Sequence, residues 1–294
     1  KAAAACGIPV RNTPGTNARS VAEYTVAMLL DLSRRVTVID GKTRKGLLPR
    51  FGMPETVGNE VTCKRLGLIG SGNVARHVAQ ICRDGFHMDI CCHSAHRSDA
   101  ELQRLGFTPM SLHDLFASCD YVSLHCQLTP ETYHLVDRRC FEVCAPGLIL
   151  LNTARGGLVD ERALYEALTS DRLAAAGLDV FEKQSPSADD PLLSLENFLA
   201  GMHVAGSTHE ALERTGAVIA DGHHRFAAAR AHARSERGAG GSDAVLALVT
   251  PMGAGGLRVD PIHRVVPELT LESAVASAAA GFVTAEVPVE DGST

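Results

Sequence analysis

The segment Gly70-Ser-Gly72-Asn-Val-Ala75 places small residues at the spacing that a dinucleotide's pyrophosphate requires. The first glycine permits a tight turn, the second lets a phosphate approach the backbone, and a small third residue lets a helix pack closely on the preceding strand. A helix that begins here directs free backbone N–H groups and its positive dipole end at the phosphates. Such turns also occur without a ligand, but the apolar run before this one and the helical pattern after it favour a dinucleotide site.

The end of the next expected strand bears on which dinucleotide is bound. In NAD-binding sites an acid about 20 residues beyond the turn binds the ribose 2′-hydroxyl. Here that place holds His93 and Ser94, with His96 and Arg97 just beyond. An acid repels a 2′-phosphate, whereas serine, histidine and arginine side chains can bind one. The sequence therefore tilts slightly toward NADP and leaves NAD open; the alternative is a solvated loop that contacts the ribose loosely.

These residues require a scaffold of alternating strands and helices. Strands are expected at 66–70, 88–92, 120–124, 147–152, 175–180 and 199–203, after a short one at 7–10. Helices are expected at 73–84, 111–118, 131–143, 159–170 and 208–219, and a capping box at Ser20 and Glu23 predicts another helix to about Arg35. The alternation predicts an α/β fold, a doubly wound parallel sheet of the Rossmann type.

Composition limits the classes of partner. The chain has 294 residues, of which 45% are hydrophobic and 21% charged, with a net charge of −6, so no nucleic acid or anionic membrane partner is expected. No apolar run approaches the roughly 20 residues of a membrane-spanning helix, and no signal peptide is visible. Nine scattered cysteines suit a reducing cytoplasm better than a disulfide framework. Cys140 and Cys144 have no second pair, so we expect core side chains and no metal site.

Six motifs carry a family resemblance. In chain order they are GIPVRNTPGTNARSVAE, the glycine turn, VSLHCQLTPET, LILLNTARGGLVDERALYEAL, GLDVFEK and HVAGSTHEALERTG. Residues 1–219 resemble the nucleotide-binding domain of the D-isomer-specific 2-hydroxyacid dehydrogenases, which include phosphoglycerate dehydrogenase and glyoxylate/hydroxypyruvate reductases. The resemblance implies an NAD(P)-dependent oxidoreductase that transfers a hydride between nicotinamide and C2 of a small 2-hydroxy or 2-keto acid. It also implies a homodimer.

The resemblance assigns three catalytic positions. Arg155 would hold the substrate carboxylate as a two-pronged fork, and His203 would be the acid/base toward the C2 oxygen. The family's glutamate, which orients the histidine and keeps its pKa high, is Gln184 here. An amide can hold an imidazole but cannot stabilise an imidazolium by charge, so we expect weak turnover. Glu182, two residues earlier, is the alternative partner of His203.

The resemblance also assigns the cofactor contacts. They are Thr13, Gly70, Gly72, Asn73, Val74, Ser94, Cys126, Thr153, Ala154, Arg155, Asp179, His203 and Gly206. Two departures from the family pattern stand beside them: Gln127 replaces a proline, and Gly201-Met202 replaces Thr-Pro. Members of the family begin with a substrate-binding subdomain, which we expect to be missing here, so the sequence is interpreted as a fragment.

Residues 220–294 change in character and are expected to form a smaller α+β segment. They resemble part of an uncharacterised domain family with ADGHHR and P-x-HR motifs. Residues His223, His224, Arg225, His263 and Arg264 either converge on a phosphate or form an ordinary surface. Two other functions therefore remain open: a nucleotide-binding module without turnover, and phosphate-ligand binding by this segment.

Replacing Ser94 with aspartate tests the cofactor interpretation. The new carboxylate repels a 2′-phosphate and binds the ribose hydroxyl of NAD, so we expect a shift in preference toward NAD of about 1–3 kcal/mol. The measurement is the ratio of dissociation constants for NADPH and NADH, from nicotinamide fluorescence. An unsubstituted chain that already prefers NAD by about tenfold or more contradicts the interpretation.

Overall fold

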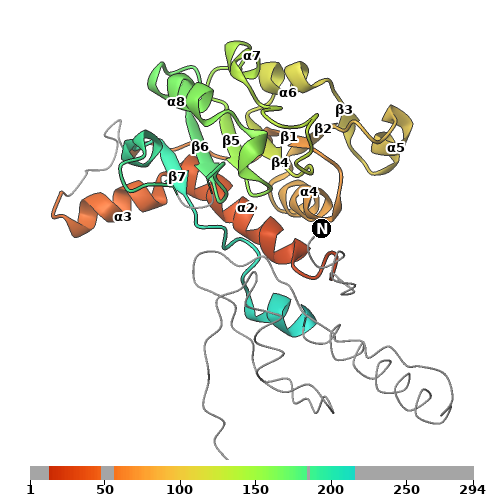
Figure 1. The fold of residues 1–294 in the computed structure, drawn as a ribbon, viewed down its shortest axis with the longest axis horizontal. Coiled ribbons are helices and arrows are strands. Elements are labelled where there is room, and N and C mark those ends of the chain that lie inside the picture. Colours follow the sequence, from red (N-terminus) through yellow and green to blue (C-terminus); the bar gives the residue numbers. More distant parts are fainter. Residues whose placement is uncertain (1–12, 48–55, 184–185, 216–294) are drawn as a thin grey trace, which may run out of the picture. The chain divides into compact units, whose positions relative to one another are not determined.

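The computed structural model of the chain describes residues 13–47, 56–183 and 186–215 (Figure 1). Within them, seven strands form one sheet in the order β3-β2-β1-β4-β5-β6-β7, and every neighbouring pair is parallel. The predicted doubly wound parallel sheet is confirmed. The expected strand at 7–10, Gln184 and the segment 220–294 lie outside the described residues.

The strands are short and mostly buried. Their bounds are β1 Arg65–Ile69, β2 Asp89–His93, β3 Thr108–Pro109, β4 Tyr121–Leu124, β5 Ile149–Asn152, β6 Ala175–Leu178 and β7 Phe198–Ala200. Every residue of β4, β5 and β6 is buried, as expected for parallel strands covered on both faces. The six strands expected between 66 and 203 are confirmed, whereas β3, two residues long, offers no periodic pattern to recognise.

Helices cover both faces of the sheet (Figure 1). They are α2 Ala18–Arg34, α3 Val36–Arg44, α4 Asn73–Phe86, α5 Asp99–Arg104, α6 Leu112–Ser118, α7 Arg138–Glu142 and α8 Glu161–Thr169. Helices α2 and α4 lie on one face, while α6, α7 and α8 lie on the other. None of the helices in the described ranges is both long and apolar enough to cross a membrane.

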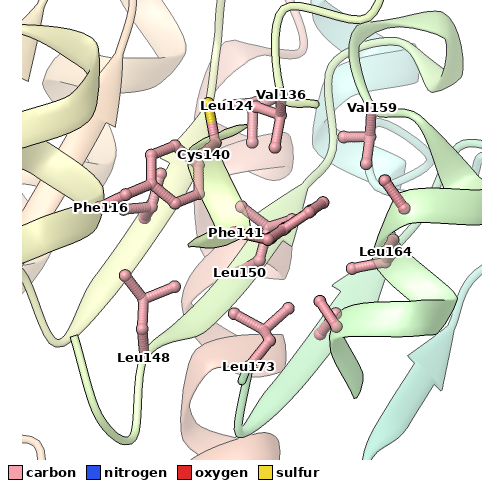
Figure 2. Close-up of a cluster of buried hydrophobic side chains, with 14 of the residues drawn as sticks. Phe116, Leu124, Val136, Cys140, Phe141, Leu148, Leu150, Val159, Leu164 and Leu173 are labelled. Carbon is pink, nitrogen blue, oxygen red and sulfur yellow. The ribbon is translucent and has the colours of Figure 1, made fainter. Parts of the chain in front are cut away.

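One buried cluster fills the space between the sheet and helices α6, α7 and α8 (Figure 2). Leu150 of the interior strand β5 lies within it and is fully buried. The rings of Phe116 and Phe141 meet edge to face, with their centroids 6.2 Å apart. Cys140 is 1% exposed and packs in the same cluster, which confirms its interpretation as a core side chain.

The predicted capping box at Ser20 is wrong. Helix α2 begins at Ala18, and its first backbone bonds run from the N–H of Ala18 to the carbonyl of Gly15 and from Val21 to Asn17. The hydroxyl of Ser20 is instead 2.8 Å from the hydroxyl of Thr208, 188 residues away. The hydroxyl of Ser20 therefore takes part in a long-range contact and does not cap a helix.

The helix predicted at 131–143 is also wrong over its first half. Only Arg138–Glu142 is helical, with the Asp137 carboxylate as its N-cap. His134 has φ of +51°, and Val136 forms a parallel bridge with Val159. Pairing with the segment that follows β5 has replaced local helix formation here.

Leu150→Ala tests the position of this core. Removing a fully buried leucine side chain leaves a cavity, so we expect the free energy of unfolding to fall by about 2–5 kcal/mol. Urea denaturation followed by circular dichroism gives the value. Leu193→Ala is the matched control, because Leu193 is 39% exposed and should cost well under half as much. Equal losses for the two variants contradict the assignment.

Candidate active site

The predicted site residues gather at one edge of the sheet. Because all the strands are parallel, their carboxyl ends meet there. Gly70 follows β1, Ser94 follows β2, Cys126 follows β4 and Arg155 follows β5. Strands β1 and β4 are neighbours although β2 and β3 come between them in the chain, so the strand order reverses at this point. Open α/β sheets bind their ligands at such a reversal.

The glycine turn has the geometry that its sequence predicts. Gly70 has φ of +102°, a left-handed conformation that favours glycine, and a Cβ atom on it would lie 2.8 Å from the carbonyl oxygen of His125. Helix α4 then starts at Asn73, with Gly72 as an N-cap that supplies no side chain. A Cβ atom on Gly72 would meet no atom within 4 Å. Space for a phosphate therefore lies directly against this helix start.

The expected ribose end holds two hydroxyl groups. Ser94 is half-buried, and the hydroxyl of Ser71 lies 3.5 Å from the hydroxyl of Ser94. Ser71 is an unspecified position of the glycine motif, so the sequence alone gave it no role. The contact between Ser71 and Ser94 forms because β1 and β2 lie side by side in the sheet.

A hollow of about 470 Å³ opens beside Ser94. It is lined by His93, Ser94, Asp99, Leu102, Pro109, Met110, Ser111 and Asp114. The carboxylate of Asp114 accepts a hydrogen bond from the hydroxyl of Ser111 at 2.6 Å. The carboxylates of Asp99 and Asp114 both line the hollow, so they oppose the binding of a phosphate group inside it.

The end of β4 presents His125, which sequence reasoning missed. Its backbone N–H donates to the carbonyl of Ile69 at 2.8 Å, and its Nε2 is 2.9 Å from the hydroxyl of Ser123. Burial lowers the pKa of His125 to about 3, so the ring is neutral at physiological pH. Burial also raises the pKa of the neighbouring Cys126 to about 11, so its thiol is protonated. Neither group is poised for acid/base chemistry at neutral pH.

Asn152, fully buried at the end of β5, shapes the turn that carries Arg155. Its side-chain nitrogen donates to the carbonyl of Arg155 at 2.8 Å, and its side-chain oxygen accepts from the N–H of Ala154 at 3.0 Å. The side chain of Arg155 is exposed, whereas Thr153 is buried with its hydroxyl 2.8 Å from that of Thr25. The sequence signal for Asn152 is a polar residue that ends an otherwise apolar strand.

Asp179, also fully buried, fixes the turn at His203. Its carboxylate accepts the N–H groups of Val204 at 3.1 Å and Ala205 at 2.8 Å. Its backbone carbonyl accepts the N–H of His203 at 2.6 Å. A Cβ atom on Gly201 would lie 2.2 Å from the Asp179 carboxylate, which explains why glycine fits where the family pattern has threonine.

The described residues show no hydrogen bond between the two catalytic candidates. Arg155 follows β5 and His203 follows β7, on either side of β6, and both side chains are exposed. The carboxylate of Glu182 accepts a hydrogen bond from the hydroxyl of Tyr133 and lies 3.5 Å from Nε2 of His134. Within the described residues, Glu182 is therefore hydrogen-bonded to Tyr133 and lies close to His134, and no contact with His203 is seen.

The two remaining cofactor candidates, Thr13 and Gly206, lie in and against one turn, residues 13–17. Thr13 begins it, and the Thr13 carbonyl accepts the hydroxyl of Thr16 at 3.1 Å. Gly206 lies against it, because a Cβ atom on Gly206 would be 2.6 Å from Nδ2 of Asn17. The first and last parts of the described chain thus meet here.

Comparison with known proteins gives two family matches. The D-isomer specific 2-hydroxyacid dehydrogenase, NAD binding domain, matches residues 26–205. A protein family of unknown function (DUF1015) matches residues 202–291.

Individual relatives agree with the first match. The D-3-phosphoglycerate dehydrogenase of Archaeoglobus fulgidus is 38% identical over 215 residues, which are 73% of this chain and 40% of the relative. The glyoxylate reductase of Korarchaeum cryptofilum is 37% identical, over 73% of this chain and 65% of that protein. A crystal structure of D-lactate dehydrogenase from Aquifex aeolicus, complexed with NAD and lactic acid, superposes with a TM-score of 0.67 at 29% identity, covering 78% of this chain and 72% of that one.

The chain spans about two fifths of the length of its phosphoglycerate dehydrogenase relatives. The family match nevertheless covers more than half of this chain, and the glycine turn, the Arg155 turn and the His203 turn stand at the carboxyl edge of the sheet. The chain therefore belongs to the D-isomer specific 2-hydroxyacid dehydrogenase family, through the NAD-binding domain of that family.

Proposed function

We propose that the chain binds NAD or NADP across its glycine turn and serves hydride transfer between nicotinamide and C2 of a 2-hydroxy or 2-keto acid. The observation that carries the proposal is Gly72. It caps the start of α4 at the point where the strand order reverses, and its Cα faces open space. A pyrophosphate fits this place because free N–H groups and the positive end of the α4 dipole point at it.

Each part of the cofactor has candidate contacts. The backbone at Gly72, Asn73 and Val74 would hold the pyrophosphate, and Ser94 would bind the adenosine ribose. We propose that NADP is bound at least as well as NAD, because Ser94, His96 and Arg97 replace the acid that would repel a 2′-phosphate. This proposal requires the 2′-phosphate to lie away from the carboxylates of Asp99 and Asp114. Once bound, the nicotinamide would supply or accept the hydride.

The substrate end rests on Arg155 and His203. An exposed guanidinium can bind a carboxylate through two parallel hydrogen bonds, which a lysine cannot copy. His203 is held by backbone and would exchange a proton with the C2 oxygen of the substrate. Gln184 stands at the position of the family's glutamate, and an amide supplies no negative charge to stabilise a protonated histidine.

Gln184 also favours the second candidate function, a nucleotide-binding module without turnover. In a serine-protease triad, loss of an orienting carboxylate costs up to about 10⁴ in rate, so the amide could end useful catalysis. Phosphate-ligand binding by residues 220–294 remains the third candidate. Most of this segment lies within the match to the family of unknown function at residues 202–291. We also propose a cytoplasmic location from the cysteine content and a homodimer from the family resemblance.

Gly72→Leu tests cofactor binding. The substitution meets no protein atom within 4 Å of the new Cβ, and φ of −73° suits any residue, so folding should be kept. The side chain would fill the phosphate space, so we expect binding of NADH and NADPH to be lost in fluorescence titrations. Gly85→Leu, in equally open space near the other end of the same helix, should bind normally. Normal titrations for Gly72→Leu would rule out this site.

Hydride transfer is tested in a chimera, in which residues 13–215 replace the corresponding segment of the Korarchaeum glyoxylate reductase. We expect NADPH oxidation with glyoxylate, hydroxypyruvate or 3-phosphohydroxypyruvate. Gln184→Glu should raise the rate, because a carboxylate stabilises by charge the imidazolium that donates a proton to the C2 oxygen. Arg155→Lys should weaken substrate binding. A chimera that binds NADPH but oxidises none of it, even with Gln184→Glu, supports the module without turnover.

A further inference from the structure

The turn at residues 13–17 lies directly against the proposed phosphate site. Gly15 has φ of +81°, and a Cβ atom on it would be 3.0 Å from Nδ2 of Asn73, the first residue of α4. On its other side the turn packs against Gly206 through Asn17. The turn therefore stands between two segments to which the family resemblance assigns cofactor contacts.

Local bonds close this turn. The N–H of Ala18 donates to the carbonyl of Gly15 at 3.2 Å, and the hydroxyl of Thr16 donates to the carbonyl of Thr13 at 3.1 Å. These bonds define the shape of the turn, but they join it only to itself and to the first residue of α2. They do not hold it against α4.

The restraint from outside comes from residues almost 200 positions later. Nε of Arg214 donates to the carbonyl of Thr16 at 2.7 Å, and a second guanidinium nitrogen lies 3.5 Å from the hydroxyl of Ser20. The hydroxyl of Thr215 donates to that of Thr16 at 3.1 Å. The segment that carries Arg214 is itself joined to α2 through the contact between Thr208 and Ser20.

We propose that Arg214 is a positioning residue of the cofactor site, which holds the 13–17 turn against the start of α4 where the pyrophosphate binds. The inference rests on the proposed function. Without Arg214 the turn gains conformational freedom in the free protein, and the cofactor must restrict that freedom when it binds, which weakens affinity. The side chain of Arg214 is exposed, so removing it leaves no buried cavity and the fold should persist.

The test compares Arg214→Met with Arg172→Met. Both are exposed arginines that donate to a backbone carbonyl; Arg172 donates to Glu142 at 3.2 Å, away from the carboxyl edge of the sheet. Titration of nicotinamide fluorescence should give dissociation constants for NADH and NADPH about tenfold higher in Arg214→Met, the scale of one charge-assisted hydrogen bond. Arg172→Met should stay within about twofold of the unsubstituted chain. Both variants should keep the thermal unfolding midpoint of the unsubstituted chain.

A second measurement separates positioning from a general loss of structure. Calorimetric titration with ADP-ribose, which carries the pyrophosphate, should show the same weakening in Arg214→Met. Titration with AMP, which ends at its first phosphate on the adenosine side, should show little change. Arg214→Lys, which keeps the charge but shortens the reach, should recover part of the affinity for ADP-ribose.

Three results overturn the proposal. The first is an unchanged cofactor affinity in Arg214→Met, and the second is an equal weakening of cofactor binding in Arg214→Met and Arg172→Met. The third is an equal weakening of AMP and ADP-ribose binding in Arg214→Met together with a lower thermal unfolding midpoint. A chain that binds neither NADH nor NADPH before any substitution overturns the proposed function, and this inference with it. Normal binding by both the unsubstituted chain and Arg214→Met overturns this inference alone.

Discussion

The site depends on the close approach of two chain segments at Gly70. Its N–H donates to the carbonyl of His93 at 2.8 Å, which joins the ends of β1 and β2. On the other side a Cβ atom on Gly70 would lie 2.8 Å from the carbonyl oxygen of His125, beyond the end of β4. A larger residue would collide with the backbone at His125, so the close approach of these segments at the glycine turn requires glycine.

Two buried polar side chains fix the backbone of the turns that carry Arg155 and His203, as Gly70 fixes the glycine turn. Asn152 and Asp179 sit at or just beyond the ends of β5 and β6, and each binds backbone groups of a loop. Buried polar groups need partners, and here the partners are the backbone of the segments that carry Arg155 and His203. The candidate reactive side chains remain exposed, while buried residues fix the backbone beneath them. This division suits a site whose reactive groups must meet a ligand.

Local patterns predicted the sheet well, because apolar runs and helical periodicity report burial directly. The glycine turn was equally readable, since its geometry depends on residues close in sequence. What the sequence could not supply were contacts between distant segments: Ser71 with Ser94, Ser20 with Thr208, and Glu182 with Tyr133. These pairs depend on tertiary packing, and one of them overruled a local interpretation. The capping box predicted at Ser20 is replaced by a long-range contact with Thr208, whereas Glu182, the alternative partner of His203, accepts a hydrogen bond from Tyr133 in the described residues.

Because the ring of His125 stays neutral in the folded protein, the domain loses stability at acid pH. Its folded pKa of about 3 is far below that of a free histidine, about 6.5. As the pH falls from about 6.5 toward 3, His125 becomes protonated in the unfolded chain but stays neutral in the folded one, so acidification favours unfolding. Above about pH 6.5 neither state is protonated and the cost vanishes. His125, whose backbone carbonyl closely approaches Gly70, therefore makes the domain sensitive to acid at the same edge of the sheet that is proposed to bind the cofactor.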